Sequence, residues 1–542
     1  MKMNLRALIF LLILTIISLP GKSQQTVFTL FKNDVKLADQ YMAEKNFQQA
    51  LKLYKRASKK GTTEKSTDLK MARCYYFIKA YKEAVAMYAK YGENLPASDL
   101  YNVAEALCGM KEYQTAIDYY SAFLKQKPDD DLVLKKIWRL DNVQFLYEDS
   151  LHYAVMPISI NSESSDLCAV PFQDGIVFMS NRKQFQIVDK IDATSNKPFY
   201  SLYQATRIQD TTTNGAFVLG KIIPFSKEIN SRLHTGPVSF YNNGKKVVFA
   251  LTSNESNARK ERTSQLYFAE IVNGKWQRTI SFPHNSLNHS ISTPSMSEDG
   301  RWLYFSSDMK GGFGGSDIYR CEYRDGHWQK PANLGEQINT VHDEVFPYVH
   351  LNHILYFSSN GQAGLGGLDI FKTEIQPGGF GEVENAGYPI NSNHDDFGIS
   401  LDSMNSHGYF SSNRGKGGYH DDIYEFDMDV QVYPLEISGL IRYKEYNWMD
   451  SAELKLYANA KLALIDNVRQ VTVYESTSDK DGNFTLMIPY FSKFKIRVTG
   501  GDNDENFVSL EIPKQRKASN KHEIVVVKDA FKLKEQQDGG KN

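Results

Sequence analysis

Between residues 30 and 147, apolar and small residues follow a helical period in a pattern that recurs about every 33 residues. The three copies run from Leu37 to Ala57, from Met71 to Tyr91 and from Val103 to Phe123. Small residues where two helices cross, with aromatic residues beside them, predict antiparallel helix pairs that stack on one another. The equivalent positions are Ala38, Ala72 and Ala104; Phe47, Tyr81 and Tyr113; Ala50, Ala84 and Ala116; and Tyr54, Tyr88 and Tyr120.

Residues 148–428 change to a period of two and repeat a longer motif. The stretch "YFSSDMKGGFGGSDIY" (Tyr304 to Tyr319) recurs from Tyr356 and from Tyr409, and looser copies begin at Val177 and Val247. A four-stranded sheet repeated every ~40–50 residues is typical of a β-propeller blade, so five copies favour five blades. In the third copy we predict strands at Pro294–Met296, Trp302–Ser306, Asp317–Tyr323 and Trp328–Leu334.

The ring closure is predicted from a segment that precedes the first copy. "PISINSESSD" (Pro157 to Asp166) resembles "GEQINTVHDE" (Gly335 to Glu344) and "GYPINSNHDD" (Gly387 to Asp396), which precede later copies. We therefore expect this N-terminal segment to supply the outer strand of the last blade. A sixth blade in the long first interval is the alternative, although we favour an insertion loop at Asp189–Lys197.

Residues 433–528 lack the glycine motif and show seven short alternating runs. Seven such strands in about 95 residues predict a small β-sandwich. The predicted strands are Leu435–Tyr443, Ala452–Ala458, Arg469–Ser476, Gly482–Pro489, Phe494–Gly500, Phe507–Pro513 and Glu523–Asp529.

The two ends of the chain have their own composition. Residues 1–23 combine Lys2 and Arg6 with an apolar run and small residues near Ser23, which predicts a secretory signal cleaved there. The run is shorter than the ~20 residues that span a bilayer. We therefore expect an exported chain without a membrane span, and a polar tail at 529–542 that does not fold.

The net charge and the positions of the cysteines bear on the partners and on the presence of disulfides. Lys+Arg of 63 against Asp+Glu of 64 gives a net charge of −1, so we expect no nucleic-acid partner. Aromatic residues make up 13% of the chain, which favours strand-rich repeats. The four cysteines, Cys74, Cys108, Cys168 and Cys321, fall in different predicted repeats, so we expect them to be free and buried.

The repeated glycine motif does not predict a phosphate loop. A phosphate loop leads into a helix, whereas "GGFGGSDIY" leads into a strand. Aspartates at equivalent or neighbouring positions suit calcium, yet hydrogen bonds to the amides of the glycine turn explain them more simply. These residues are Asp308, Asp317, Asp369 and Asp422.

A candidate binding site lies just before each inner strand, where histidine follows asparagine and acidic residues stand beside it. Strand order predicts that these residues converge at one mouth of the propeller channel, where they could hold a cation or a peptide amine. The alternative is that each Asn and His fixes its own turn. The candidates are His234, His289, His342, Asp343, Glu344, His394, Asp395 and Asp396, downstream of Asn230, Asn288, Asn339 and Asn391.

Catalytic motifs are missing from the sequence. It contains neither the G-x-S-x-G elbow of α/β-hydrolases nor the H-E-x-x-H helix of zinc proteases. We therefore predict a protein that is not an enzyme and that has no cofactor and no resident metal.

The helical copies resemble a tetratricopeptide array, spanning 24–147 with a further amphipathic helix from Leu132 to Tyr147 as a cap. In that family the first helices of the pairs line a concave face that binds peptides. The alternative is that the array only packs against a neighbouring domain. The family's groove positions correspond to Asp39, Met42, Leu69, Arg73, Tyr76, Tyr101 and Glu105.

The strand copies are similar to the PD40 repeats of TolB-type propellers, through F-S-S-[DN]-x-x-G-G-x-G-G-x-D-I-[YF]. The fifth copy departs from this pattern at Tyr419 and His420. In the third domain, "SDKDGNFTL" (Ser478 to Leu486) is similar to the carboxypeptidase regulatory-like fold, also called transthyretin-like.

This domain order resembles PorE-type envelope proteins of the type IX secretion and gliding machinery. The resemblance implies a non-catalytic periplasmic scaffold at the outer membrane, with a PorP/SprF-type β-barrel among its protein partners. In that group an OmpA-like domain normally follows the sandwich and a lipid anchor can precede the helices. The sequence shows neither, so it does not predict peptidoglycan binding or lipid anchoring. The competing hypothesis is a glycan- or metal-binding, sensor-like propeller.

Overall fold

The computed structural model describes residues 34–528, except for 62–64, 92–93, 149, 184–190, 193–196, 210–216, 352, 403–405, 417, 429–434, 447–451, 468–469, 490–492, 501–504 and 511–520. The predicted signal peptide, the polar tail and most of the predicted insertion loop lie outside the described residues. The chain divides into two compact units, Met1–Glu148 with Val155–Glu425, and Asp149–Ala154 with Phe426–Asn542. The two units are described separately below.

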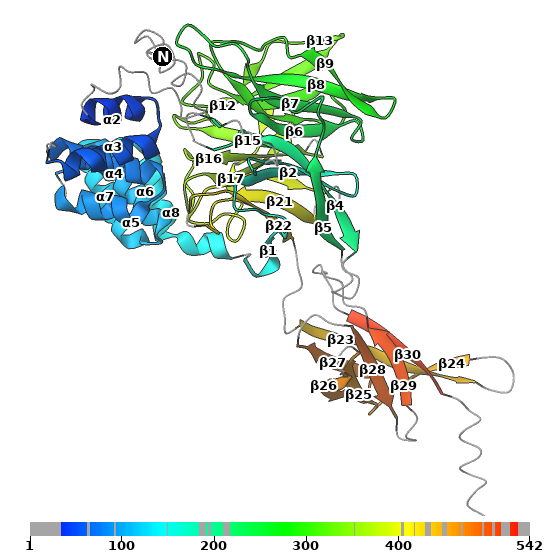
Figure 1. Cartoon of the computed structure of the whole chain (residues 1–542). Helices are drawn as coiled ribbons and strands as arrows, with labels where there is room; N and C mark the ends of the chain where they lie inside the picture. Colours follow the sequence, from blue (N-terminus) through cyan, green and yellow to red (C-terminus); the bar gives the residue numbers. More distant parts are fainter. Residues whose placement is uncertain are drawn as a thin grey trace, which may run out of the picture. The chain divides into compact units, whose positions relative to one another are not determined.

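The first unit begins with stacked helix pairs (Figure 1). Each pair joins two antiparallel helices through a short turn that contains a lysine with positive φ, namely Lys45, Lys79 or Lys111. The pairs are α2 (Asp34–Ala43) with α3 (Phe47–Lys59), α4 (Lys65–Phe77) with α5 (Tyr81–Tyr88), and α6 (Ala97–Gly109) with α7 (Tyr113–Gln126), followed by α8 (Asp131–Asp141).

The small and aromatic positions predicted to pack the helices do so. The six equivalent alanines are 0% exposed, and so are Tyr54 and Tyr88, while Tyr120 is 1% exposed. The buried hydroxyls donate to carboxylates: Tyr54 to Asp39, Tyr88 to Asp99 and Tyr120 to Glu105. These bonds satisfy phenol groups that would otherwise be costly to bury.

The last helix of the array is shorter than predicted. A helix was expected from Leu132 to Tyr147, but α8 ends at Asp141 and Val143–Tyr147 form a 3-10 turn. Asn142 explains the end, because its side-chain amide donates to the Trp138 carbonyl and occupies an acceptor at the helix terminus.

The remainder of the first unit is a β-propeller. The described residues form five antiparallel meander sheets, one for each sequence copy, and give no sheet to the alternative sixth blade. Their strands are β2 (Asp166–Phe172), β3 (Gly175–Ser180), β4 (Ser201–Gln209) and β5 (Phe217–Pro224); β6 (Thr235–Tyr241), β7 (Lys246–Thr252), β8 (Ser264–Val272) and β9 (Lys275–Ser281); β10 (Ile291–Met296), β11 (Trp302–Ser307), β12 (Asp317–Arg324), β13 (His327–Trp328) and β14 (Ala332–Asn333); β15 (Glu344–His350), β16 (Ile354–Ser359), β17 (Asp369–Gln376), β18 (Gly379–Phe380) and β19 (Glu384–Asn385); and β20 (Asp396–Leu401), β21 (His407–Ser412) and β22 (Asp422–Asp427) with β1 (Ala154–Pro157).

The predicted third copy agrees with the observed blade except at its edges. The inner strand β10 begins at Ile291, earlier than Pro294, because a β-bulge between Ser292 and Ser295 lets pairing continue across the proline. The outer strand is split into β13 and β14, which both pair with β12.

The ring closes through the segment that the sequence identified, but the closing strand lies slightly earlier. β1 ends at Pro157 and lies beside β22, whereas the strand was expected within Pro157–Asp166. The later residues of the segment instead bind the backbone of β22: Asn161 bridges the amide and carbonyl of Ile423. The N-terminal side therefore completes the last blade.

The second unit contains two four-stranded sheets that share one hydrophobic core. The prediction missed the strand Lys461–Asp466, because its "LALI" run is buried without a period of two. The first sheet contains β23 (Leu435–Tyr446), β24 (Ala452–Leu456), β27 (Asn483–Ile488) and β30 (Lys521–Lys528); the second contains β25 (Lys461–Asp466), β26 (Val471–Thr477), β28 (Phe494–Thr499) and β29 (Glu505–Leu510).

The four cysteines are buried and form no disulfide, as predicted. None of the helices in the described ranges is both long enough and apolar enough to cross a membrane.

Candidate functional site

The glycine motif forms a turn that its own aspartate holds. Asp317 accepts the amides of Phe313, at 2.6 Å, and Gly314, at 3.3 Å. Asp369 holds the equivalent turn through the Leu365 and Gly366 amides. The predicted bonds to the turn amides are therefore present at Asp317 and Asp369, whereas Asp308 accepts the Ser290 amide at 2.6 Å. In the divergent fifth copy, Asp422 pairs with Lys416 instead, at 2.7 Å.

The second glycine pair of the motif permits close approach to the next blade. A Cβ atom added at Gly314 would lie 2.3 Å from the Val341 backbone carbon, and one added at Gly366 would lie 2.2 Å from the His394 carbonyl oxygen. The glycine loop of one blade is therefore packed directly against the histidine-containing loop of the next.

Asparagines in the loops before the inner strands clamp each blade to its neighbour. Each side-chain amide bonds both the N–H and the C=O of one residue in the third strand of the preceding blade. The sequence assigned Asn288 to this position in the third blade, but the structure places Asn285 there, and it also adds Asn161. The pairs are Asn161 with Ile423, Asn230 with Leu202, Asn285 with Leu266, Asn339 with Ile318, and Asn391 with Ile370.

The acidic residues predicted at the mouth of the propeller channel also form hydrogen bonds or ion pairs with neighbouring loops. Asp343 accepts the Ser316 amide at 2.9 Å, and Glu344 accepts the Thr340 amide at 2.7 Å and the Ser359 hydroxyl at 2.6 Å. Burial raises the pKa of Glu344. Asp396 is 0% exposed and pairs with Arg414. These carboxylates hold loops in place.

The four histidines each make contacts of their own. His234 accepts the Tyr200 amide at 3.2 Å, and His289 is half-buried in a different blade. His342 stacks on Tyr101 of α6, with ring centroids 6.0 Å apart. Burial lowers the pKa of His234, His342 and His394, which favours their neutral forms.

The helical array packs on the propeller at this same end. The Lys79 ammonium lies 3.0 Å from the Asp395 carboxylate. Burial acts to raise the pKa of Asp395, but the charge of Lys79 together with hydrogen bonds from Lys79, Leu368 and Asn413 outweighs it, so the pKa of that carboxyl is lowered. Tyr147 also stacks on Tyr388, with centroids 4.8 Å apart. Helices and propeller are therefore joined through the predicted mouth.

The residues predicted to line the peptide-binding groove mainly contact other residues of the helical array or the propeller. Asp39 pairs with Lys70 at 2.7 Å, Arg73 with Asp99 at 2.7 Å, and Glu105 with Lys136 at 2.8 Å. Met42 contacts the Cys74 thiol, Leu69 packs on the core of the array, Tyr76 contacts Phe77 edge to face, and Tyr101 lies against His342. Asp39 and Arg73 remain 42% and 35% exposed, so the first two repeats keep part of this surface open.

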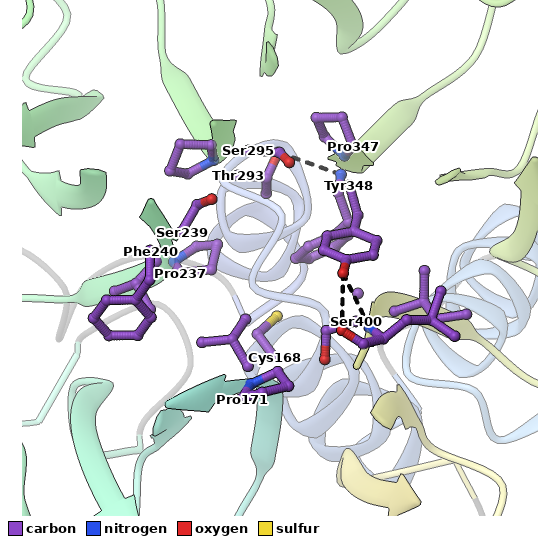
Figure 2. A pocket seen from close by; sticks show the side chains of 17 residues that line it. Cys168, Pro171, Pro237, Ser239, Phe240, Thr293, Ser295, Pro347, Tyr348 and Ser400 are labelled. Carbon is purple, nitrogen blue, oxygen red and sulfur yellow. Dashed lines mark hydrogen bonds between the residues drawn. The ribbon is translucent and has the colours of Figure 1, made fainter. Parts of the chain in front are cut away.

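A cavity of about 170 Å³ lies among the five inner strands (Figure 2). This cavity was not predicted from the sequence, and none of the predicted site residues lines it. One feature of the sequence could have indicated the cavity: several inner strands contain a proline, and a proline within a strand indicates a bulge. The lining residues come from β2, β6, β10, β15 and β20: Cys168, Val170, Pro171, Pro237, Val238, Ser239, Phe240, Thr293, Pro294, Ser295, Phe346, Pro347, Tyr348, Gly398, Ile399, Ser400 and Leu401.

Within the described ranges, no group of three or more His, Cys, Asp or Glu side chains could hold a metal ion.

Neither a protein-family model nor a curated protein sequence matches the chain. Among solved structures it is similar to the β-propeller domain of the Trilobed protease from Pyrococcus furiosus, at 9% identity and a TM-score of 0.23, covering 65% of this chain and 96% of that one. It is also similar to CoXyl43, a GH43 β-xylosidase/α-arabinofuranosidase from a compost microbial metagenome, at 9% identity and a TM-score of 0.32, covering 55% and 96%. A protein of unknown function from Dyadobacter fermentans matches at 10% identity and a TM-score of 0.31, covering 51% and 99%. Likenesses this distant carry no argument about activity.

Proposed function

We propose that the protein is a non-catalytic, exported scaffold that binds protein partners at the periplasmic side of the outer membrane, as an accessory component of type IX secretion or gliding. In this proposal the helices are tetratricopeptide repeats, the propeller is a five-bladed PD40 propeller, and the second unit is a carboxypeptidase regulatory-like sandwich. The resemblance to PorE-type proteins makes a PorP/SprF-type β-barrel the leading partner.

The observation that carries the proposal is an apolar face on the last helix of an array whose other side is occupied by the propeller. Leu134 and Trp138, one turn apart on α8, are 47% and 56% exposed. The terminal helix of a stacked array usually presents a polar outer face, because no neighbour covers it. An exposed apolar face at that position supports a protein partner that packs there.

The propeller contacts support a fixed platform rather than a catalytic mouth. The polar candidates pair with turn amides, with arginine or with lysine, as Asp343, Asp396 and Asp395 do. Such pairing gives a rigid surface, which lowers the ordering cost of binding a large partner.

Affinity purification tests the proposal. The tagged full chain is expressed in its native envelope, the envelope is solubilised in detergent, and the recovered proteins are identified by mass spectrometry. We expect enrichment of an outer-membrane β-barrel and of secretion or gliding components. Recovery of the chain without any of these would contradict the proposal.

The glycan- or metal-binding alternative stays a prediction. It requires ligand-dependent stabilisation that disappears when His342 and His394 are replaced by alanine. Both histidines are half-buried, and His342 lies against Tyr101 of the helical array. A ligand there would have to compete with the packed helices, so this alternative is the less favoured one.

A further inference from the structure

We propose that the cavity among the inner strands is a binding site for one small, uncharged aromatic molecule of the size of benzene, phenol or indole. This inference is independent of the scaffold proposal and concerns a different part of the propeller from the predicted mouth. It rests on the cavity's size, its uncharged lining, the state of its hydroxyl groups and its fixed shape.

The size of the cavity limits the ligand. Its volume is about 170 Å³. An apolar cavity of about 150 Å³ is large enough to bind benzene. The space therefore suits one aromatic ring or a fused pair, and it is too small for an oligosaccharide or a nucleotide.

The lining selects an uncharged ligand. Among the described residues, those that line the cavity carry no ionisable carboxylate, ammonium, guanidinium or imidazole group. The aromatic residues among the lining are Phe346 and Tyr348, both on β15, and Phe240 on β6. Placing a charge in such a space would cost its hydration without supplying a counter-charge, whereas a neutral ring gains apolar contact.

The hydroxyl groups around the cavity are already bonded to neighbouring blades. Ser239 accepts the Met296 amide at 3.0 Å, Ser295 accepts the Val349 amide at 2.9 Å, and Ser400 donates to the Ala169 carbonyl at 2.7 Å. The Tyr348 hydroxyl bonds the backbone of Leu401, with the Leu401 carbonyl 3.1 Å away (Figure 2).

These bonds leave few strong sites for water. A buried water molecule needs two to four polar partners. Each of these hydroxyls already has one protein partner across a blade boundary. Ser239 and Ser295 accept in theirs and each keep an O–H that can donate, so water finds few partners in the cavity. Displacing poorly ordered water by an apolar group increases affinity.

The shape of the cavity is fixed by a bulge in every inner strand. All five described inner strands have a register shift at the equivalent place. The first bulge residue has positive φ in each case: Cys168, Gly236, Thr293, Phe346 and Gly398. Three of these are not glycine, so the surrounding structure must hold them in a disfavoured conformation. A pre-formed cavity binds without the cost of ordering its walls.

Thermal unfolding of the full chain with added ligands tests the inference. Benzene, phenol and indole should raise the midpoint temperature in a concentration-dependent way. Benzoate and benzylammonium, which have similar rings with a charge, should not. N-acetyl-tryptophanamide distinguishes the natural source: competition with indole points to a side chain of a partner protein, and failure to compete points to a free small molecule.

A cavity-filling variant and a matched control test whether the rise in midpoint temperature comes from binding in this cavity. Val170→Trp places an indole ring in the cavity and should abolish the shift, whereas Val341→Trp, at a position 71% exposed, should retain it. If Val170→Trp does not fold, Cys168→Ala provides the second readout, because a wider cavity should favour indole over phenol. Absence of any shift with neutral rings, or equal shifts in Val170→Trp and wild type, would overturn the inference.

Discussion

The side-chain amide of Asn161 closes the propeller by binding both backbone groups of Ile423, a residue 262 positions away. Its Nδ2 lies 2.8 Å from the Ile423 carbonyl oxygen, and the Ile423 amide lies 3.0 Å from its Oδ1. Four other asparagines make the same pair of bonds between consecutive blades. The contact that closes the ring is therefore the same contact that joins its internal blades.

Replacing Asn161 tests this closure. Asn161→Ala removes two hydrogen bonds and leaves an amide and a carbonyl without partners, so we expect a loss of about 2–3 kcal/mol in the free energy of unfolding. Asn288→Ala, at an exposed position outside the clamps, should stay within about 0.5 kcal/mol of wild type. Chemical denaturation measures both. Equal effects of the two changes would contradict the clamp.

The Lys79–Asp395 pair should hold the helices on the propeller. Lys79→Met leaves Asp395, whose side chain is 15% exposed, without its counter-charge. We expect a loss of about 1–3 kcal/mol and faster amide exchange in α4 and α5, because removing one partner of a mostly buried pair is costly.

The double variant Lys79→Met with Asp395→Asn should recover part of that loss, since no isolated charge remains. Lys82→Met, at an exposed position of α5, is the control. Unchanged exchange in α4 and α5 after Lys79→Met would show that the ion pair does not fix the helices.

The glycine motif predicts a contrast between two glycines of one blade. Gly366→Ala would bring a Cβ within 2.2 Å of the His394 carbonyl oxygen, so we expect a loss of about 1–3 kcal/mol. Gly379→Ala has no heavy atom within 4 Å of the new Cβ and should be nearly neutral. Thermal denaturation compares the two. If Gly366→Ala left the stability unchanged, the two blades could move apart at this contact without loss of stability.

Asp421 makes a pH-dependent prediction. Burial and the nearby Asp395 raise its pKa to about 6, from an ordinary value of 3.8. Because the folded pKa is raised, ionised Asp421 destabilises the fold above pH 6, and this penalty fades as the pH falls from 6 towards 4.

Asp421→Asn should therefore stabilise the protein by about 1–2 kcal/mol at pH 8 and by little at pH 4. Asp325→Asn, whose side chain is 78% exposed, should show no such trend. Denaturation curves across this pH range measure the difference. If Asp421→Asn raised the free energy of unfolding equally at pH 4 and pH 8, the raised pKa of Asp421 would be refuted.

The sequence predicted features that repeat within the chain. Ala38, Ala72 and Ala104 aligned because each fills the same helix crossing, and the glycine motif aligned because each copy makes the same turn. The copies also located the closure near Pro157–Asp166. Repetition makes such positions visible without a structure, since one packing solution is used several times.

Features made by contacts between different copies were not predictable in this way. The sequence placed His342 and His394 at an open mouth, but helices from another domain pack there, as the Tyr101–His342 contact shows. Asn285 was missed because its loop differs in length from the others. The strand at Lys461–Asp466 was missed because a central strand buried on both faces has no alternation to detect.

Quantitative co-purification tests the proposed outer-membrane scaffold most directly. Wild type, the double variant Leu134→Glu with Trp138→Glu, and the control Lys135→Glu are purified from detergent-solubilised envelopes. We expect wild type and Lys135→Glu to recover an outer-membrane β-barrel with secretion or gliding components, and the double variant to recover at least tenfold less. Wild-type protein that recovers no outer-membrane or secretion component would contradict the claim.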